Sequence, residues 1–136
     1  MLNNSDVSVE LLEGLAENSF DSILVTDAAD GKITYANKAF TTLTGHGASD
    51  VIGKTPKILQ GEGTDKKVIS RLTEALKSGG DFEGTAINFK KDGTPFNMYW
   101  RVVPVRVKGV IKAYVAIQRE RSAALLGKDA VVATPR

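Results

Sequence analysis

The 136-residue chain has the length of one globular domain, since domains usually take about 100 to 200 residues. Its 18 lysines and arginines nearly balance its 16 aspartates and glutamates, and the net charge of +2 disfavours a strongly basic surface for nucleic acid or anionic membranes. The lack of cysteine excludes disulfides and thiolate chemistry, and a single histidine excludes zinc sites built on two or more histidines.

The start of the chain predicts a helix followed by a hairpin. Apolar residues recur at helical spacing after an N-cap at Ser5 or Asp6, and the helix ends before Asn18. Two short β-rich runs follow at residues 22–26 and 32–36, joined through an Asp-Gly dipeptide that favours a tight turn.

The middle of the chain predicts three helical segments. Asn37 caps a short helix over residues 38–44, and residues 49–52 form at most one further turn. The clearest helix starts at Thr64 or Asp65, carries an apolar stripe, and ends at two consecutive glycines.

The rest of the chain predicts three antiparallel strands, at residues 82–90, 95–107 and 110–120, separated by Asp-Gly and Lys-Gly turns. Two early strands, a helical middle and three late strands predict an α+β domain. Its single antiparallel sheet is expected to bury one face under the helices, with a ligand cavity between the two layers.

The chain shows no run of about 18 apolar residues and no basic, apolar leader. We therefore expect no membrane span and a cytoplasmic location. We divide the chain into an N-terminal cap helix at residues 1–19, a domain at 20–120, and a C-terminal helix or flexible tail at 121–136.

The order and spacing of several motifs resemble the PAS superfamily and, within it, the light-oxygen-voltage (LOV) flavin-binding branch. The segments that carry the resemblance are residues 25–27, 33–40, 44–45, 53–61, 88–96 and 104–105. The fold that the resemblance implies is a five-stranded antiparallel sheet in the order 2-1-5-4-3, with helices on one face and an amphipathic N-terminal helix.

The LOV signature Gly-x-Asn-Cys-Arg-Phe-Leu-Gln corresponds to residues 53–60, which read Gly-Lys-Thr-Pro-Lys-Ile-Leu-Gln. Pro56 occupies the position of the reactive cysteine, and proline has no nucleophile. The resemblance therefore implies a domain that binds flavin non-covalently, without the cysteinyl-adduct cycle. FMN is the expected cofactor, with FAD as the alternative.

The resemblance also implies roles for individual residues. Gln60 matches the glutamine near the flavin ribityl chain, Asn88 the first of two ring asparagines, and Gln118 the glutamine that faces the ring atoms N5 and O4. The second ring asparagine is Met98 here. The first phosphate arginine is Lys57, which keeps the charge but loses the bidentate fork.

The second phosphate arginine falls at Thr73, and Arg71 lies about 200° around the helix from it, so Arg71 is no simple substitute. Strand alternation places Tyr114 and Ala116 on the same face as Gln118. The complete set of candidate cofactor-binding residues is Thr26, Asn37, Lys57, Gln60, Leu72, Asn88, Met98, Tyr114, Ala116 and Gln118.

No catalytic constellation is visible, and we expect no enzyme activity. The first interpretation is a photoreceptor-like sensory domain that binds flavin and signals through subunit or partner contacts. We expect a homodimer formed through the N-terminal helix and the outer sheet face, and a separate, unidentified downstream signalling protein. The alternative is a PAS interaction or dimerisation module that holds no flavin and is empty or occupied by another small ligand.

Overall fold

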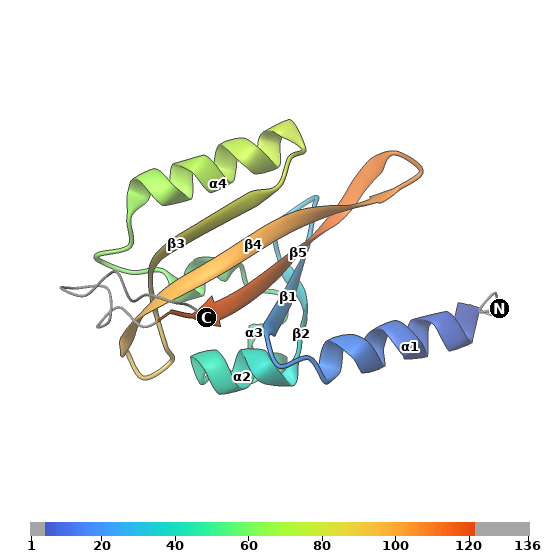
Figure 1. Ribbon diagram of the computed structural model, residues 1–136, viewed down its shortest axis with the longest axis horizontal. Coiled ribbons are helices and arrows are strands. Elements are labelled where there is room, and N and C mark those ends of the chain that lie inside the picture. Colours follow the sequence, from blue (N-terminus) through green and yellow to red (C-terminus); the bar gives the residue numbers. More distant parts are fainter. Residues whose placement is uncertain (1–4, 122–136) are drawn as a thin grey trace.

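The computed structural model describes residues 5–121, which form a five-stranded antiparallel sheet with helices (Figure 1). The elements in chain order are α1 (Ser5–Glu17), β1 (Ser22–Asp27), β2 (Ile33–Ala36), α2 (Lys38–Thr44), α3 (Ala48–Val51), the 3-10 helix η1 (Pro56–Leu59), α4 (Lys66–Ser78), β3 (Phe82–Phe89), β4 (Pro95–Val107) and β5 (Val110–Glu120). The sheet order β2-β1-β5-β4-β3 confirms the predicted order 2-1-5-4-3. The predicted C-terminal segment lies outside the described residues from residue 122 onward.

Two local elements differ from the sequence-based prediction. The 3-10 helix η1 was not predicted, because four residues are too few to show a helical period. Pro56 starts it, and the fixed φ of proline suits the first position of a helix. The single turn α3 begins at Ala48, one residue earlier than expected, and its C-cap Ile52 already has an extended ψ of 131°.

The helix boundaries follow from local hydrogen bonds. Asn37 caps α2 because its side chain accepts a hydrogen bond from the backbone N–H of Phe40 at 3.0 Å. Asp65 caps α4 in the same way through the N–H of Lys67 at 2.8 Å. Gly79 ends α4 with a left-handed φ of 78°, which residues with a side chain rarely adopt.

The hydrophobic core consists of two clusters on the inner face of the sheet. The first lies between β1, β2 and the short helices, with Leu24, Ile33, Phe40, Val51 and Leu59 each at most 1% exposed. The second lies under β3 and β4, and its members are Phe82, Ala86, Phe96, Met98, Trp100 and Val102. Ala116 on the central strand β5 packs against both clusters, so the space between them lies beneath the middle of the sheet.

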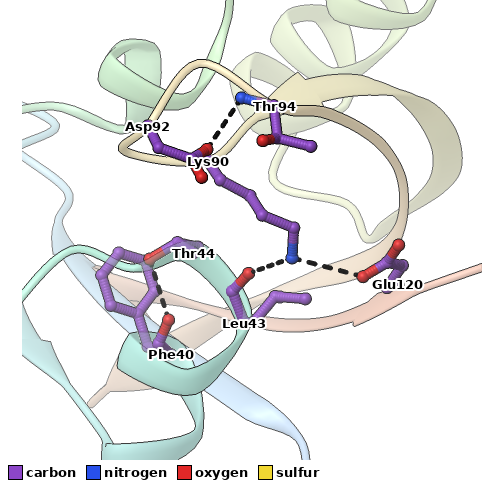
Figure 2. Close-up of polar contacts among 7 residues, drawn as sticks. All are labelled: Phe40, Leu43, Thr44, Lys90, Asp92, Thr94 and Glu120. Atoms are coloured by element: carbon purple, nitrogen blue, oxygen red, sulfur yellow. Dashed lines mark hydrogen bonds and ion pairs between the residues drawn. The ribbon is translucent and has the colours of Figure 1, made fainter.

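The turn between β3 and β4 is tied to the helical layer through Lys90 (Figure 2). Its Nζ donates to the carbonyl oxygen of Leu43 in α2 at 2.7 Å and lies 3.3 Å from the Glu120 carboxylate at the end of β5. A backbone bond from Lys91 to Thr44, 2.7 Å long, reinforces the contact. A cation at the C-terminal carbonyls of a helix is favourable, and here it joins three distant segments.

The helix α1 does not pack on the outer face of the sheet. It extends away from the sheet (Figure 1), and Leu12 and Leu15 are each 64% exposed. Its C-terminal end is anchored in the domain, where Asn37 Nδ2 donates to the Ala16 carbonyl at 2.8 Å. The Tyr35 hydroxyl also donates to the Glu17 carboxylate there, at 2.7 Å. The side chains of Leu12 and Leu15 are therefore exposed on this helix.

Candidate ligand-binding site

The inner face of the sheet brings together the side chains of alternating residues on three strands. On β5, Tyr114, Ala116 and Gln118 face inward, while Asn88 on β3 and Met98 on β4 face the same side. The pairing of Trp100 with Gln118 places β4 and β5 side by side at this level. The alternation predicted from the sequence therefore holds in the folded domain.

These side chains line an enclosed cavity of about 80 Å³ between the sheet, η1 and α4. Its lining residues are Leu24, Thr26, Pro56, Leu59, Gln60, Leu72, Leu76, Asn88, Met98, Trp100, Val102, Tyr114, Ala116 and Gln118. Eight of the ten candidate cofactor-binding residues are among them. The cavity is smaller than the roughly 300 to 1,000 Å³ of typical ligand pockets.

The cavity adjoins a more open cleft of about 550 Å³ that reaches the surface between α4, η1 and the β1–β2 hairpin. The two share Thr26, Pro56, Gln60, Leu72, Leu76 and Tyr114 as common walls. No residue of α4 is fully buried, so Leu72 and Leu76 form a half-buried wall. A shift of this helix would enlarge the cavity, and it would also change the packing of Leu72 and Leu76 against the core cluster under β3 and β4.

Two buried amides face the cavity from different strands. Gln118 is 3% exposed, and its Oε1 accepts a hydrogen bond from the Ser22 hydroxyl at 2.9 Å. Asn88 is also 3% exposed, and its Nδ2 donates to the carbonyl oxygen of Ala86 at 3.3 Å. Amides both donate and accept, so this end of the cavity suits a ligand with a mixed polar edge.

The remaining cavity wall is apolar. Met98, at the position of the second ring asparagine, is 3% exposed and belongs to the cluster under β4. Trp100 is 5% exposed and stacks at a tilt on Phe82, with 5.1 Å between ring centroids. A flat apolar ligand would therefore meet aromatic and thioether surface beside the two amides.

Lys57 and Asn37 are the two candidate residues that do not line the cavity. Lys57 is exposed and lines the outer cleft. Asn37 is fully buried elsewhere, and its side chain accepts from the N–H groups of Ile23 and Phe40 while donating to the carbonyls of Ala16 and Asp21. These four contacts join α1, β1 and α2, so we remove Asn37 from the candidate binding set.

The structure adds residues that sequence reasoning missed. Ser22 is 2% exposed and holds the Gln118 amide, and Trp100 lines the cavity next to it. Ser22 could have been found from the alternation of β1, because it shares a face with Leu24 and Thr26. No sequence pattern singles out Lys77 as a residue of the outer cleft, because exposed lysines are common on helices.

The arrangement is suited to binding rather than to acid–base chemistry. Among the residues that line the cavity, Tyr114 is the one titratable side chain, and its hydroxyl donates to the Leu76 carbonyl at 3.2 Å. Across the described residues, no three His, Asp or Glu side chains gather as a metal site would require. Within the same part of the chain, no helix is long and apolar enough to cross a membrane.

The sheet order, the helices on its inner face and the cavity between them define a PAS domain. A model of the PAS fold family matches residues 10–121, and the chain belongs to this family.

Its relatives place the domain with the LOV proteins. Phototropin-1A of Oryza sativa subsp. japonica is 33% identical over 132 residues, which cover 95% of this chain and 14% of that protein. The blue-light-activated histidine kinase of Brucella anthropi is 38% identical over 90 residues, or 65% of this chain and 18% of that protein. The chain thus spans less than a fifth of either relative.

Solved structures agree with this placement. The light-state structure of the LOV domain of the blue-light photoreceptor aureochrome1 superposes with a TM-score of 0.74 at 31% identity. The match covers 84% of this chain and 91% of that one. The protein described here is therefore a LOV-like PAS domain, homologous to sensory domains of blue-light receptors.

Proposed function

We propose that this domain binds a flavin non-covalently in the cavity under the sheet, with FMN as the cofactor, and acts as a cytoplasmic sensory module rather than an enzyme. The observation that carries the proposal is the convergence of Asn88 and Gln118, from separate strands, on one cavity with Trp100 in its wall. The names of the relatives, which include phototropins and blue-light-activated kinases, support a role in light sensing.

The fit of a three-ring flavin requires the α4 wall to move. The enclosed space of about 80 Å³ accepts only part of such a ring, whereas cavity and adjoining cleft together offer ample room. Leu72 and Leu76 separate the two, and both are half-buried on a helix without fully buried residues. Binding would displace these two side chains toward the cleft and change their packing against the cluster under β3 and β4, whereas the cluster between β1 and β2 has no contact with α4 to lose.

When bound, a flavin supplies blue-light absorption and reversible electron transfer. The Gln118 amide would meet the ring where its hydrogen-bonding pattern depends on the redox state. Ser22 can respond to a rotation of this amide, because a hydroxyl both donates and accepts. Since β5 continues from Gln118 to Glu120, which contacts Lys90, a change at the amide would reach the end of the strand.

The same proposal excludes a cysteinyl adduct as the photochemical product. Pro56 lines the cavity at the position of the reactive cysteine, and the 136-residue sequence contains no cysteine. A photocycle of this domain would then proceed through flavin excitation or reduction without a covalent bond to the protein.

We also propose that output runs through a homodimer. The exposed leucines of α1 and the apolar outer face of β5, where Ile117 is 39% exposed, are surfaces that a second copy could cover. The relatives include a kinase much longer than this chain. We therefore propose that the downstream effector is a separate segment or a separate protein.

Trp100 provides a direct test, because it is the single tryptophan of the chain and lines the cavity. Titrating the purified protein with FMN should quench Trp100 fluorescence and give the visible absorption of bound oxidised flavin. Thermal unfolding should also shift upward, with a stabilisation of about 2.7 kcal/mol at a ligand concentration of roughly 100 times Kd.

Matched variants locate the site. Asn88→Leu should weaken flavin binding by about tenfold, since it removes an amide from the cavity. Asn97→Leu should leave binding unchanged, because Asn97 points to the opposite face of β4. Equal effects of the two substitutions would contradict the proposed site.

The second candidate function is a PAS interaction module without flavin. The observation that favours it is the small enclosed cavity, in which Met98 replaces a polar side chain with an apolar one. A protein that takes up no FMN, riboflavin or FAD in the fluorescence titration, yet forms a dimer, would establish this alternative.

A further inference from the structure

We propose that a second cleft, between α1, α2 and the end of β5, is a ligand site of its own, and that it takes a free amino acid with an apolar side chain. We call it the α1/α2 cleft. Its walls come from the last residue of α1 and the loop that follows, from α2, and from residues 118–120 of β5. Its volume of about 540 Å³ lies within the roughly 300 to 1,000 Å³ of typical ligand pockets.

Two side chains of opposite charge line the α1/α2 cleft without an ion-pair partner. Glu17 is the last residue of α1, and Lys38 is the first residue of α2. Within residues 5–121, no ion pair joins either of them to another charged side chain. Unpaired charges of both signs in one cleft are complementary to a ligand that carries both signs. A free amino acid is such a ligand, because its amino group is protonated and its carboxyl group is ionised at neutral pH.

The other charged side chains of the cleft are already paired. Arg119 binds the Asp21 carboxylate through two nitrogens, at 2.8 and 3.0 Å. Lys90 lies 3.3 Å from the Glu120 carboxylate and donates to the carbonyl of Leu43 at 2.7 Å (Figure 2). Among the described residues, the cleft therefore offers one unpaired cation and one unpaired anion, and a ligand with a single charge would leave one of them without a partner.

The carboxylate of Glu17 is held in place for such a contact. This residue is half-buried, and its Oε1 accepts a hydrogen bond from the Tyr35 hydroxyl at 2.7 Å. A carboxylate offers about four lone-pair sites, so one hydroxyl leaves most of its acceptor capacity unused. An ammonium group can therefore bind Glu17 without displacing Tyr35.

The inner wall of the α1/α2 cleft carries an amide that also faces the cavity under the sheet. Gln118 lines both spaces. Its Oε1 accepts from the Ser22 hydroxyl at 2.9 Å, whereas its Nε2 donates to none of the described residues. The amide NH2 carries two donors. The carboxylate of a ligand in the cleft can accept from this group and from Lys38.

Phe20 supplies the apolar part of the site. Its side chain is 102% exposed and lines the cleft together with Ala39 and Leu43. An apolar side chain of the ligand would remove part of this ring from water, and aromatic rings gain further from packing against each other. The site should therefore prefer amino acids with an aromatic side chain, and L-phenylalanine is the probe.

The test is a set of NMR titrations with L-phenylalanine and two analogues that each lack one charge. L-phenylalanine should bind with a dissociation constant on the order of 1 mM, as expected for a ligand of this size. It should shift the backbone amide signals of residues 17–20 and 38–43. The analogue 3-phenylpropionate lacks the ammonium, and phenethylamine lacks the carboxylate. Each should bind about tenfold more weakly.

Substitutions that remove one charge should give a crossed pattern. Lys38→Met should weaken L-phenylalanine by about tenfold and leave phenethylamine unchanged. Glu17→Gln should weaken L-phenylalanine by about tenfold and leave 3-phenylpropionate unchanged. The amide oxygen of Glu17→Gln still accepts from Tyr35, so the end of α1 stays anchored. Phe20→Ala should remove the preference for L-phenylalanine over L-alanine.

Lys66→Met and Glu74→Gln are the matched controls on α4, since neither residue lines the α1/α2 cleft. Both should keep the dissociation constant of L-phenylalanine within about twofold of wild type, because exposed charges outside a site contribute little.

Three results would overturn the amino-acid site. They are the absence of shifts at the cleft amides, shifts centred on Asn88 and Met98 in the cavity instead, and equal effects of Lys38→Met on all three ligands. The titrations contain no added flavin, so their failure leaves the proposed flavin site intact. A protein that binds L-phenylalanine in this pattern but takes up no flavin would retain this inference and lose the proposed function.

Discussion

Single side chains decide what the cavity can do chemically. The amides of Asn88 and Gln118 are buried and hydrogen-bonded, and such groups are costly to leave without partners. The side-chain oxygen of Gln118 accepts its hydrogen bond from Ser22. A ligand that competes for the amide must therefore offer a replacement hydrogen bond, which favours heterocycles with donors and acceptors along one edge.

Pro56→Cys is expected to restore adduct photochemistry if the flavin lies as proposed. Position 56 lines the cavity, so blue light should bleach the visible flavin absorption, and the absorption should recover in the dark. Loss of the fixed proline φ at the start of η1 should lower stability by about 0.4 to 1 kcal/mol.

Pro56→Ser is the control for this substitution, because it makes the same backbone change without a thiol. It should bind flavin and show no bleaching. Bound flavin that stays unbleached in the cysteine variant would mean that position 56 does not face the reactive part of the ring.

At the level of elements, one anchor of α1 is Tyr35 of β2, whose hydroxyl donates to the Glu17 carboxylate at the C-terminal end of the helix. Burial and the hydrogen bond to Glu17 raise the pKa of Tyr35 to about 12. The folded state therefore holds this proton more tightly than the unfolded chain, whose tyrosine has an ordinary pKa of 10.0. The protonated Tyr35 hydroxyl makes its full contribution to the free energy of unfolding below pH 10, and this contribution is lost as the pH rises through about 12.

Urea unfolding across this alkaline range should show the effect as a decline in the free energy of unfolding. Tyr35→Phe should remove this part of the pH dependence and cost about 0.5 to 1.5 kcal/mol at neutral pH, the value of one hydrogen bond. Identical alkaline profiles for wild type and Tyr35→Phe would show that the contact with Glu17 does not anchor α1.

The elements around the cavity also differ in how firmly they are held. The strands β4 and β5 pair over most of their length, and Lys90 ties the end of β5 to α2. The helix α4 covers the cavity with half-buried side chains only. Any enlargement of the cavity should therefore come from α4, because the sheet would have to break backbone hydrogen bonds to move.

At the level of the whole molecule, the exposed apolar surface predicts association. Leu12 and Leu15 on α1 are each 64% exposed, and burying a leucine contributes about 1.5 to 3 kcal/mol. Leu12→Glu combined with Leu15→Glu should raise the dimer dissociation constant by at least about tenfold. Sedimentation velocity over a range of protein concentrations would measure it.

Glu10→Gln is the matched substitution on the same exposed helix, because it changes charge without changing apolar area. It should leave the dissociation constant within about twofold of wild type, as exposed charges contribute little. A wild-type protein that is monomeric at all concentrations would contradict association through α1.

Much of the fold follows from patterns that are local in the chain. The Asp-Gly turn, the caps at Asn37 and Asp65, and the alternation along β5 depend on neighbouring residues, and the structure confirms them. The convergence of the inner face of β5 with Asn88 could also be predicted, because a two-residue period assigns each side chain to a face of the sheet.

The tertiary structure alone decided where these local elements meet. Whether α1 covers the sheet, and whether Asn37 faces a ligand or joins three elements, depends on contacts between residues far apart in sequence. The position of Arg71 against the Phe82 ring, outside the cleft, likewise depends on how α4 is rotated against the sheet. The sequence by itself determined which faces are apolar and which positions on them carry amides, because side-chain periodicity follows from backbone geometry. Which of these faces meet was determined by the packing free energy summed over the whole domain.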